Sequence, residues 1–483
     1  MQILLLNSSR RDLLKAGGLA LASVYLGKVP VILAEEQPNK AIALHVRKDV
    51  GTLAIDDPIL VTYRKAVTAM QALPPDDPRN WNAQARIHND RCPHGNWFFL
   101  PWHRAYLYYF EDICREVTGD KAFALPYWNW TKDPQVPAAF WGDNNPLAHP
   151  REVGANDTIE PEFVGPTVIE EIIAKTDFQD FASFKSTKQR GGVGGGKREL
   201  EFRPHDNIHG FIGGHMATVS MSALDPIFWL HHANIDRIWA KWNELGRANT
   251  NDPIWTNYVF QGDFVAANKH PQNKPVSEVT STYALQYRYD DQAETPTRPT
   301  VTPKPLIRVP ELTMSASNKE SAKSRIPLGI SVPANARFLA AAESIAEADS
   351  LPLAATRLTE PEPKEQTVRL RISQVTPPRN KRAFARVFIN CPYLSEKTPI
   401  NDPHYVATLG FFGANHEGSD HAEGPEYVLD LTDTLAKLNR SKNFPTDKID
   451  VQLLALPRGK DVAGAEVLAG KFEITVATAT GEA

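Results

Sequence analysis

Apolar residues follow two different periods along this chain, and the change of period divides it once. Between residues 40 and 289 they recur with helical spacing, most clearly in Phe98 to Glu116 and in Asp225 to Leu245. After residue 305 they form short alternating runs between Pro, Gly, Asn and Asp clusters, at Thr367 to Val375, Ala383 to Cys391, Tyr405 to Gly413, Ile449 to Leu456 and Phe472 to Val476. The pattern predicts a mainly α domain at 35–289 and a C-terminal all-β sandwich at 306–483. The stretch 314–366 is rich in Ala, Ser and Pro and gives no assignment.

The two parts are joined by a proline-rich segment, residues 290–305. It holds four prolines and no aromatic residue, which is typical of an extended linker and of a protease-sensitive site.

The N-terminus has the pattern of an export signal. Arg10 and Arg11 form a twin-arginine pair, followed by the uncharged run Ala16 to Gly27 and a cleavage point near Ala34. We therefore expect a signal peptide at 1–34 and a periplasmic or secreted protein. The alternative is an amphipathic first helix that happens to carry two arginines. The apolar run is too short to cross a hydrocarbon core of about 30 Å, so no permanent membrane span is predicted.

Composition narrows the function classes. The chain has 483 residues with 53 Lys and Arg against 57 Asp and Glu, a formal net charge of -4 that disfavours a nucleic-acid partner. Its three cysteines cannot make a disulfide framework. The 14 histidines, in contrast, are clustered.

The histidines form two groups. His88, His94 and His103 fall within 16 residues. His205 and His209 are four residues apart, so on a helix both imidazoles leave the same face, and His232 from a second helix can join them. Two groups of three neutral imidazoles favour zinc, copper, iron or nickel and disfavour magnesium or calcium. Three-histidine sites also leave coordination positions open for a reactant.

The flanking residues resemble a known family. The segment Phe99 to Arg104, the His205/His209 pair, and Asp225 to His232 with Asp236 and Arg237 look like the CuA and CuB signatures of tyrosinases, catechol oxidases and molluscan haemocyanins. The resemblance extends to plant-type polyphenol oxidases through Pro74 to Arg79, through Tyr287 to Tyr289, and through Lys471 to Ile474, a variant of the terminal Lys-Phe-Asp-Val motif.

The resemblance implies a dinuclear centre of two copper ions in a four-helix bundle. CuA would be held by His88, His94 and His103, and CuB by His205, His209 and His232, with His231 a structural neighbour. The family places its first CuA histidine about twenty residues before the second, whereas His88 precedes His94 by six. His45 is therefore the alternative first ligand. Cys92 beside His94 implies a Cys92–His94 thioether, with a free thiol as the alternative.

Three more residues receive roles from the resemblance. Glu201 would hold a water beside CuB, with an ordinary helix carboxylate as the alternative. Asp206 stands where hydroxylating members often carry Asn, and it is the second candidate catalytic residue: its carboxylate would either accept the substrate proton more strongly than an amide does or add negative charge that opposes phenolate binding. Val219 occupies the position of a bulky gate residue.

The resemblance also implies a role for the C-terminal domain. We expect this domain to cover the copper site until a protease cuts within 290–305. The alternative is that it is only a structural appendage.

The predicted function is oxidation of o-diphenols to o-quinones by O2, with hydroxylation of monophenols as an added capacity. The partners are then small phenols and O2, together with a copper chaperone and an activating protease. Two alternatives are a haemocyanin-like reversible oxygen carrier and a zinc hydrolase; for the latter the sequence offers no HExxH glutamate.

Overall fold

The structure is a computed structural model that describes residues 20–26, 29–35, 44–296, 306–350, 366–413, 424–459 and 462–481. It separates into two compact units, Met1–Leu44 and His45–Ala483. In the first unit the described residues form an antiparallel hairpin of β1 (Ala20–Leu26) and β2 (Val29–Glu35). The export pair Arg10 and Arg11 lies outside the described residues. Among the helices described, none is both long and apolar enough to cross a bilayer.

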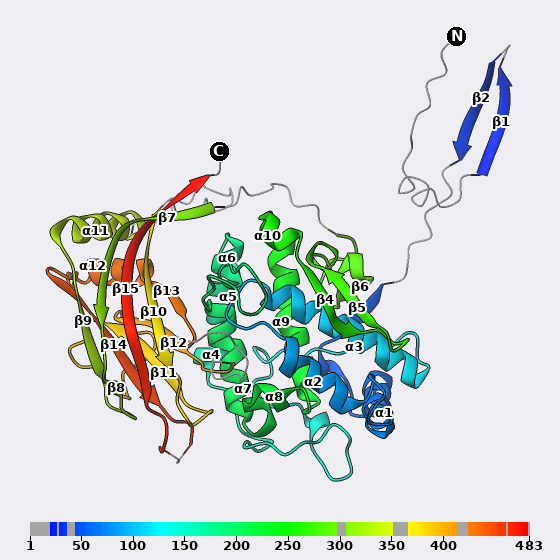
Figure 1. The fold of residues 1–483 in the computed structure, drawn as a ribbon, viewed down its shortest axis with the longest axis horizontal. Coiled ribbons are helices and arrows are strands. Elements are labelled where there is room, and N and C mark those ends of the chain that lie inside the picture. Colours follow the sequence, from blue (N-terminus) through cyan, green and yellow to red (C-terminus); the bar gives the residue numbers. More distant parts are fainter. Residues whose placement is uncertain are drawn as a thin grey trace. The chain divides into compact units, whose positions relative to one another are not determined.

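The first part of the second unit is mainly helical, as predicted (Figure 1). Its longest helices are α1 (Pro58–Ala72), α2 (Trp81–Arg91), α3 (Phe99–Thr118) and α9 (Ile227–Glu244). The shorter ones are α4 (Pro161–Val164), α5 (Pro166–Ala174), α6 (Phe178–Phe181), α7 (Asp206–Ile212), α8 (Val219–Ser222) and α10 (Pro253–Thr256). Single turns are η1 (Val50–Thr52), η2 (Ala138–Phe140), η3 (Glu201–His205), η4 (Gly214–Ala217), η5 (Val276–Glu278) and η6 (Tyr283–Leu285).

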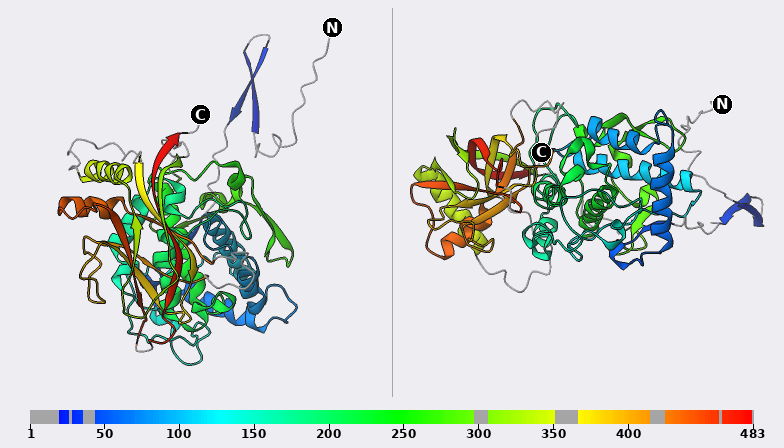
Figure 2. Two further views of the ribbon diagram at one scale, coloured as in Figure 1. Left: turned by 60° about the vertical axis from the view of Figure 1, so that its left-hand side comes forward. Right: turned by 90° about the horizontal axis from the view of Figure 1, so that it is seen from below.

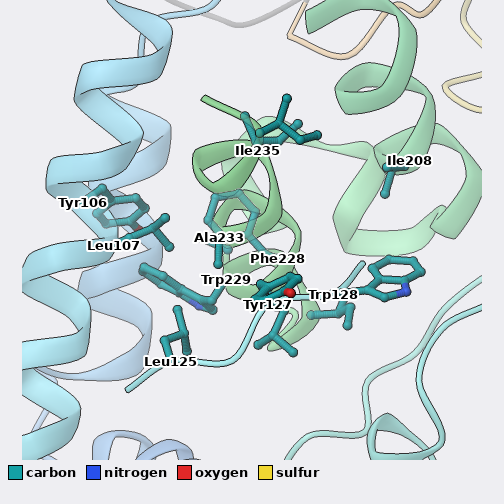
Figure 3. Packing of buried hydrophobic residues seen from close by; sticks show 14 of the residues in the cluster. Tyr106, Leu107, Leu125, Tyr127, Trp128, Ile208, Phe228, Trp229, Ala233 and Ile235 are labelled. Atoms are coloured by element: carbon teal, nitrogen blue, oxygen red, sulfur yellow. The ribbon is translucent and has the colours of Figure 1, made fainter. Parts of the chain in front are cut away.

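Aromatic side chains fill the core between these helices. α1 and α9 both pack against α3, and the ring of Trp229 stacks on Phe110 with centroids 3.5 Å apart. Figure 3 shows Phe228 and Trp229 of α9 beside Tyr106 of α3. The mainly helical domain is present, and its arrangement as a regular four-helix bundle stays a prediction. What the fold does establish is a rigid apolar frame around the histidine-bearing helices.

The helical part closes on itself through its first and last strands. β3 (His45–Arg47) pairs in parallel with β6 (Tyr287–Tyr289), and β4 (Val259–Val265) pairs with β5 (Pro271–Pro275). The start of the predicted linker is also attached: Tyr127 donates to Asp290 at 2.8 Å, and Arg237 pairs with Asp291 at 2.6 Å. The first two residues of the predicted linker are therefore held against the helical part, and positions 297–305 lie outside the described residues.

The C-terminal part is built on two antiparallel sheets. One sheet has the order β13 (Tyr427–Asp430), β10 (Gln366–Thr376), β15 (Val467–Gly481), β7 (Leu306–Ser317), and β8 (Ser321–Ala322) also pairs with β15. The other has the order β12 (Tyr405–Leu409), β11 (Phe384–Ile389), β14 (Lys448–Leu456), β9 (Leu328–Pro333). Their apolar side chains share one core, which agrees with the predicted sandwich.

The prediction of an all-β C-terminal domain is wrong in one respect, because it contains two helices. α11 (Ala336–Ser350) and α12 (Thr432–Arg440) pack on each other beside the sheets (Figure 2). α11 lies in the unassigned stretch and holds six alanines, the residue with the highest helix propensity. The strand predicted for Tyr405 to Gly413 also ends early, at Leu409, and the four residues after it approach the histidines.

Candidate metal centre

Five helical segments and one connection supply the six predicted ligands. His88 lies in the last turn of α2 and His103 in the first turns of α3, with His94 in the segment between them. His205 and His209 come from η3 and α7, and His232 from the middle of α9. Five of the six are buried and His94 is half-buried.

The turn that carries His205 is a π-helix. Pro204 lies inside it, and the backbone N–H of Asp206 bonds to the carbonyl of Glu201, five residues back. Proline has no N–H to give to the carbonyl four residues before it, so the wider turn is a local consequence of the sequence. It brings the rings of His205 and His209 to a centroid distance of 4.7 Å.

The six imidazoles form one continuous cluster. Within the first triad the centroids are 5.5 to 5.8 Å apart, and His205 and His209 lie 5.1 and 5.7 Å from His232. The triads meet where His103 and His232 stack at 4.2 Å. One ligand atom from each of His88, His103 and His232 also falls within a single 4.8 Å group, so the cluster joins the two predicted triads in one site.

Hydrogen bonds at Nδ1 orient these rings. The partners at Nδ1 are the Val219 carbonyl for His88 (3.0 Å), the Phe99 carbonyl for His103 (2.8 Å), the Met216 carbonyl for His209 (2.7 Å) and an Asp206 oxygen for His205 (2.9 Å). An acceptor at Nδ1 fixes the proton there and leaves Nε2 as a lone-pair donor. The Nε2 atoms of His103, His205, His209 and His232 are buried and have no hydrogen-bond partner among the described residues.

This donor set fits a divalent or monovalent transition metal. Burial lowers the pKa of His103 to about 3 and holds the pKa values of His205, His209 and His232 well below the usual value, so the imidazoles are neutral near pH 7. Neutral, buried imidazoles with lone pairs facing one another are costly unless an ion binds them. The arrangement suits copper or zinc and offers the borderline metals two neighbouring positions.

The two remaining histidines of interest lie in different places. His231 is buried in the same group as His205, His209 and His232, 5.3 Å from the ring of His205, and neither of its ring nitrogens has a hydrogen-bond partner among the described residues. His45 lies on β3, paired with Tyr287. The structure thus groups His88, and not His45, with the predicted copper ligands.

Glu201 and Asp206 are both buried beside the cluster and are held in different ways. Glu201 accepts hydrogen bonds from the Gly95 N–H (2.6 Å) and the Ser183 hydroxyl (2.7 Å). Asp206 lies between His205 Nδ1 and the ammonium of Lys197, whose Nζ is 2.5 Å from one carboxylate oxygen. Burial raises the pKa of Asp206, and Lys197 opposes that shift. Both Asp206 oxygens are therefore engaged, one by His205 and the other by Lys197.

Cys92 is buried next to the site. Its Sγ lies 3.5 Å from Nδ1 of His94, and it forms no disulfide bond. Burial raises the pKa of the Cys92 thiol, so it is a neutral thiol in this environment.

A short segment of the C-terminal domain enters the site. We call residues 410–413, Gly-Phe-Phe-Gly, the plug segment. The ring of Phe412 stacks on His209 with centroids 3.6 Å apart and an interplanar angle of 7°, and it also contacts His94 and His205. At Gly413 φ is +75°, and a Cβ there would lie 3.0 Å from Cγ of His94. A larger residue would therefore be strained and crowded against His94 where the plug segment turns away from the histidines.

A cavity that both domains line lies beside the plug segment, and Phe412 and Gly413 form part of its lining. Val219, the predicted gate, begins α8 and contributes to this cavity, and its carbonyl is the partner of His88. The rest of the lining comes from Asn89, Ala217, Thr218, Ser220, Pro377, Pro378, Lys381, Phe411, Phe412 and Gly413. Val219 thus lines this cavity, and its backbone carbonyl contacts a candidate ligand.

Sequence reasoning missed Phe412, Lys197 and Ser183. Phe412 had a visible signal, an aromatic pair between two glycines, but the segment reads as the end of a strand. Lys197 closes a glycine-rich loop that has no periodicity. The place of Lys197 in the site depends on its contact with Phe412, 215 positions away. A pattern of neighbouring residues cannot reveal such a contact.

Comparison with known proteins gives a consistent result. The family model for the common central domain of tyrosinase matches residues 77–166 and 142–245, and a model for a domain of unknown function matches residues 320–474. Tyrosinase HcTyr1 of Hahella sp. (strain CCB-MM4) is 27% identical over 87% of this chain and 97% of its own length. Aureusidin synthase of Antirrhinum majus is 30% identical over 57% of each chain, so this chain spans little more than half of that plant relative.

Solved structures share the fold. A latent aurone synthase (polyphenol oxidase) superposes with a TM-score of 0.66 at 21% identity, over 92% of this chain and 91% of that one. A functional unit of octopus hemocyanin gives 0.51 at 18% identity, over 89% and 99%. Together, the histidine cluster, the matched central domain and the tyrosinase and polyphenol oxidase relatives identify the chain as a copper oxidoreductase of the tyrosinase and polyphenol oxidase family of type-3 copper proteins.

Proposed function

We propose that this protein uses O2 and two copper ions to oxidise o-diphenols to o-quinones, and that it also hydroxylates monophenols. The observation that carries the proposal is the convergence of buried, neutral imidazoles whose Nδ1 positions are already engaged. We assign His88, His94 and His103 to CuA and His205, His209 and His232 to CuB. When bound, the two ions would supply the two-electron redox chemistry that couples O2 reduction to phenol oxidation.

The protein's own groups would handle the substrate proton. A phenol must lose its proton to bind a metal, and a base held beside the site does this best. The Glu201 carboxylate is fixed by Gly95 and Ser183, which supports a role in holding the water that accepts this proton. Asp206, paired with Lys197, would accept a hydrogen bond from His205 Nδ1 and so orient that ring.

We propose that Cys92 forms a thioether to a ring carbon of His94: the S–H and ring C–H bonds break, the C–S bond forms, and the two electrons and two protons pass to O2, the oxidant of the proposed function. The 3.5 Å approach of the buried Cys92 Sγ to the His94 ring supports it. A covalent bond would hold His94, the half-buried ligand that has no helix of its own, in one orientation. A peptide mass lower by two hydrogens than that of the unmodified pair is the expected result.

The C-terminal domain would act as a shield for the site. Phe412 stacks on His209 where an aromatic substrate would have to lie, so access requires the plug segment to leave. We propose that a protease acting in 290–305 begins this step. With the plug segment withdrawn, the small Val219 would leave the entrance open to monophenols as well as diphenols.

We also propose that the protein is exported by the twin-arginine route, through Arg10 and Arg11, to the periplasm or the exterior. This route carries folded proteins, so copper would be inserted before export, with help from a chaperone.

The test is oxygen uptake by the copper-loaded chain with catechol and then phenol, in three states: intact, cut within 297–305, and cut with the two pieces separated. Uptake with catechol that requires about two coppers per chain supports the proposal. Reversible O2 binding with no quinone formed in any state would instead favour the oxygen-carrier alternative, whose structural relative is the more distant of the two. A full-length Phe412→Ala variant separates blockage by the ring from other effects of the cut.

A further inference from the structure

The plug segment fills the site with a ring and a carbonyl group at the same time. The Phe412 ring lies flat on His209, and the Phe412 carbonyl accepts a hydrogen bond of 2.6 Å from the ammonium of Lys197. Lys197 is 1% exposed and comes from the helical domain, so the contact crosses between the two domains. The helical domain thus provides a flat imidazole, His209, on which a ring can stack, and an ammonium, Lys197, that can donate to a carbonyl oxygen.

The covalent skeleton between these two groups is that of a 3-arylpropanoyl unit. In a phenylalanine residue the ring is followed by Cβ, Cα and the carbonyl carbon, and that carbonyl is part of an amide. A small molecule with the same skeleton can place its ring on His209 and its carbonyl oxygen at Lys197 once the plug segment has left.

The charge around Lys197 determines which carbonyl compounds fit. Its Nζ lies 2.5 Å from an Asp206 oxygen and 3.7 Å from a Glu201 oxygen, and all three side chains are buried. The ammonium is therefore already compensated by carboxylates. A third carboxylate would add like charge in a poorly solvated site, whereas a neutral amide or ester carbonyl would not.

We propose that Lys197 is a specificity-determining residue that donates to the side-chain carbonyl of phenolic substrates, and that the preferred class is 3-arylpropanoyl amides and esters. A tyrosyl residue within a peptide carries the same unit. As a statement about substrate choice, this proposal rests on the oxidase function proposed above. Binding of the ring and the carbonyl group itself needs no copper.

The first experiment measures binding without turnover. The copper-free full chain is cut within 297–305, both pieces are kept, and urea is set so that half of the C-terminal piece is released, as judged by size-exclusion chromatography. A ligand that binds where Phe412 lies promotes release, by about tenfold when present at ten times its Kd. The probes are 3-phenylpropanamide, the shorter phenylacetamide, anionic 3-phenylpropanoate and cationic 3-phenylpropylamine.

We expect 3-phenylpropanamide to promote release most strongly. Equal effects of the four probes, or no effect of 3-phenylpropanamide, would overturn the proposal, and this comparison needs only the unmodified chain. Lys197→Met, set at its own urea midpoint, should remove the preference for the amide. The matched control is Lys188→Met, an exposed lysine nine residues earlier, which should retain it.

The second experiment connects binding to substrate choice in the copper-loaded, activated chain. Two catechols are compared, dihydrocaffeamide, which carries the propanamide side chain, and 4-ethylcatechol, which lacks the carbonyl group. The amide should show the lower KM, by about tenfold, the gain expected of a hydrogen bond from a charged donor. Lys197→Met should bring the two KM values together. An amide preference in the release experiment without any oxygen uptake would refute the oxidase function and leave the Lys197 site supported. Oxygen uptake without an amide preference would refute the Lys197 site and leave the oxidase function supported.

Discussion

At the scale of single residues, the site depends on groups that hold the histidines and not only on the histidines themselves. The carbonyls of Val219, Phe99 and Met216 are fixed by the backbone, so no substitution of those side chains removes them directly. Asp206 is different, because the acceptor for His205 is a side chain whose other oxygen is bound by Lys197.

We predict that Asp206→Asn lowers copper affinity. An amide can present either its oxygen or its NH2 group to His205, and it no longer pairs with the Lys197 charge. Loss of such a supporting group costs about 10- to 100-fold in metal affinity. Copper competition with a chelator measures this, with Asp143→Asn on the exposed surface as the control. An unchanged affinity would show that Asp206 does not orient His205.

At the scale of elements, two local features set the site geometry. One is the π-turn η3, whose extra residue allows His205 and His209 to converge. The other is the attachment of β3 and β6 to α3 and α9. Arg104 bonds to Asp236 at 2.5 Å, and both Tyr287 and Tyr289 donate to Asp236 at 2.6 Å. This network fixes the helix that carries His232.

We predict that Pro204→Ala weakens metal binding more than it weakens the fold. With an N–H at position 204, the turn can relax to an ordinary α-helix, which would rotate His205 by about 100° relative to the preceding turn. Copper occupancy should fall while the thermal midpoint changes little. Pro253→Ala, at the first turn of α10, is the control. Full occupancy in Pro204→Ala would mean that tertiary packing alone maintains the π-turn.

We predict that Asp236→Asn lowers the free energy of unfolding by about 3–5 kcal/mol at pH 7, because it leaves buried arginines without their counter-charge. Burial acts to raise the pKa of Asp236, but Arg104 and Arg47 lower it below its usual value. Its stabilisation is therefore complete above about pH 4 and is lost as pH falls through the lowered pKa. The difference between parent and variant in urea unfolding should narrow with acid. Tyr287→Phe, which removes one hydrogen bond, is the milder comparison.

At the scale of the molecule, the two domains share more than a covering contact. Arg386 binds Glu162 through two hydrogen bonds of 2.7 and 2.9 Å, and Arg369 binds Asp180. Phe202 of the helical domain belongs to the core of the sandwich, while Phe412 belongs to the helical core together with Phe384, Leu454 and Leu456. Such an interface resembles a permanent one.

We predict that a cut within 297–305 leaves the two pieces associated in buffer, so that cleavage alone produces little oxygen uptake. Arg386→Met should weaken the association by about 2 kcal/mol, roughly thirtyfold, because it removes the arginine that neutralises the buried Glu162 carboxylate. Analytical ultracentrifugation of the cut chain measures this. Arg325→Met, which removes an exposed pair within the C-terminal domain, should have no effect. Spontaneous separation of the parental pieces would contradict the prediction.

The sequence by itself determined what local pattern can carry. Helical spacing identified α3 and α9, alternation identified β10, β11 and β14, and residue type and spacing marked the histidines that the structure gathers into one cluster. These features depend on neighbours a few positions apart. The tertiary structure decided what depends on distant ones: that α11 joins the sandwich, that Asp206 is held by Lys197, and that Phe412 lies on His209 across 203 positions of chain. Such contacts leave no period in the sequence, because their geometry exists only after both domains have packed.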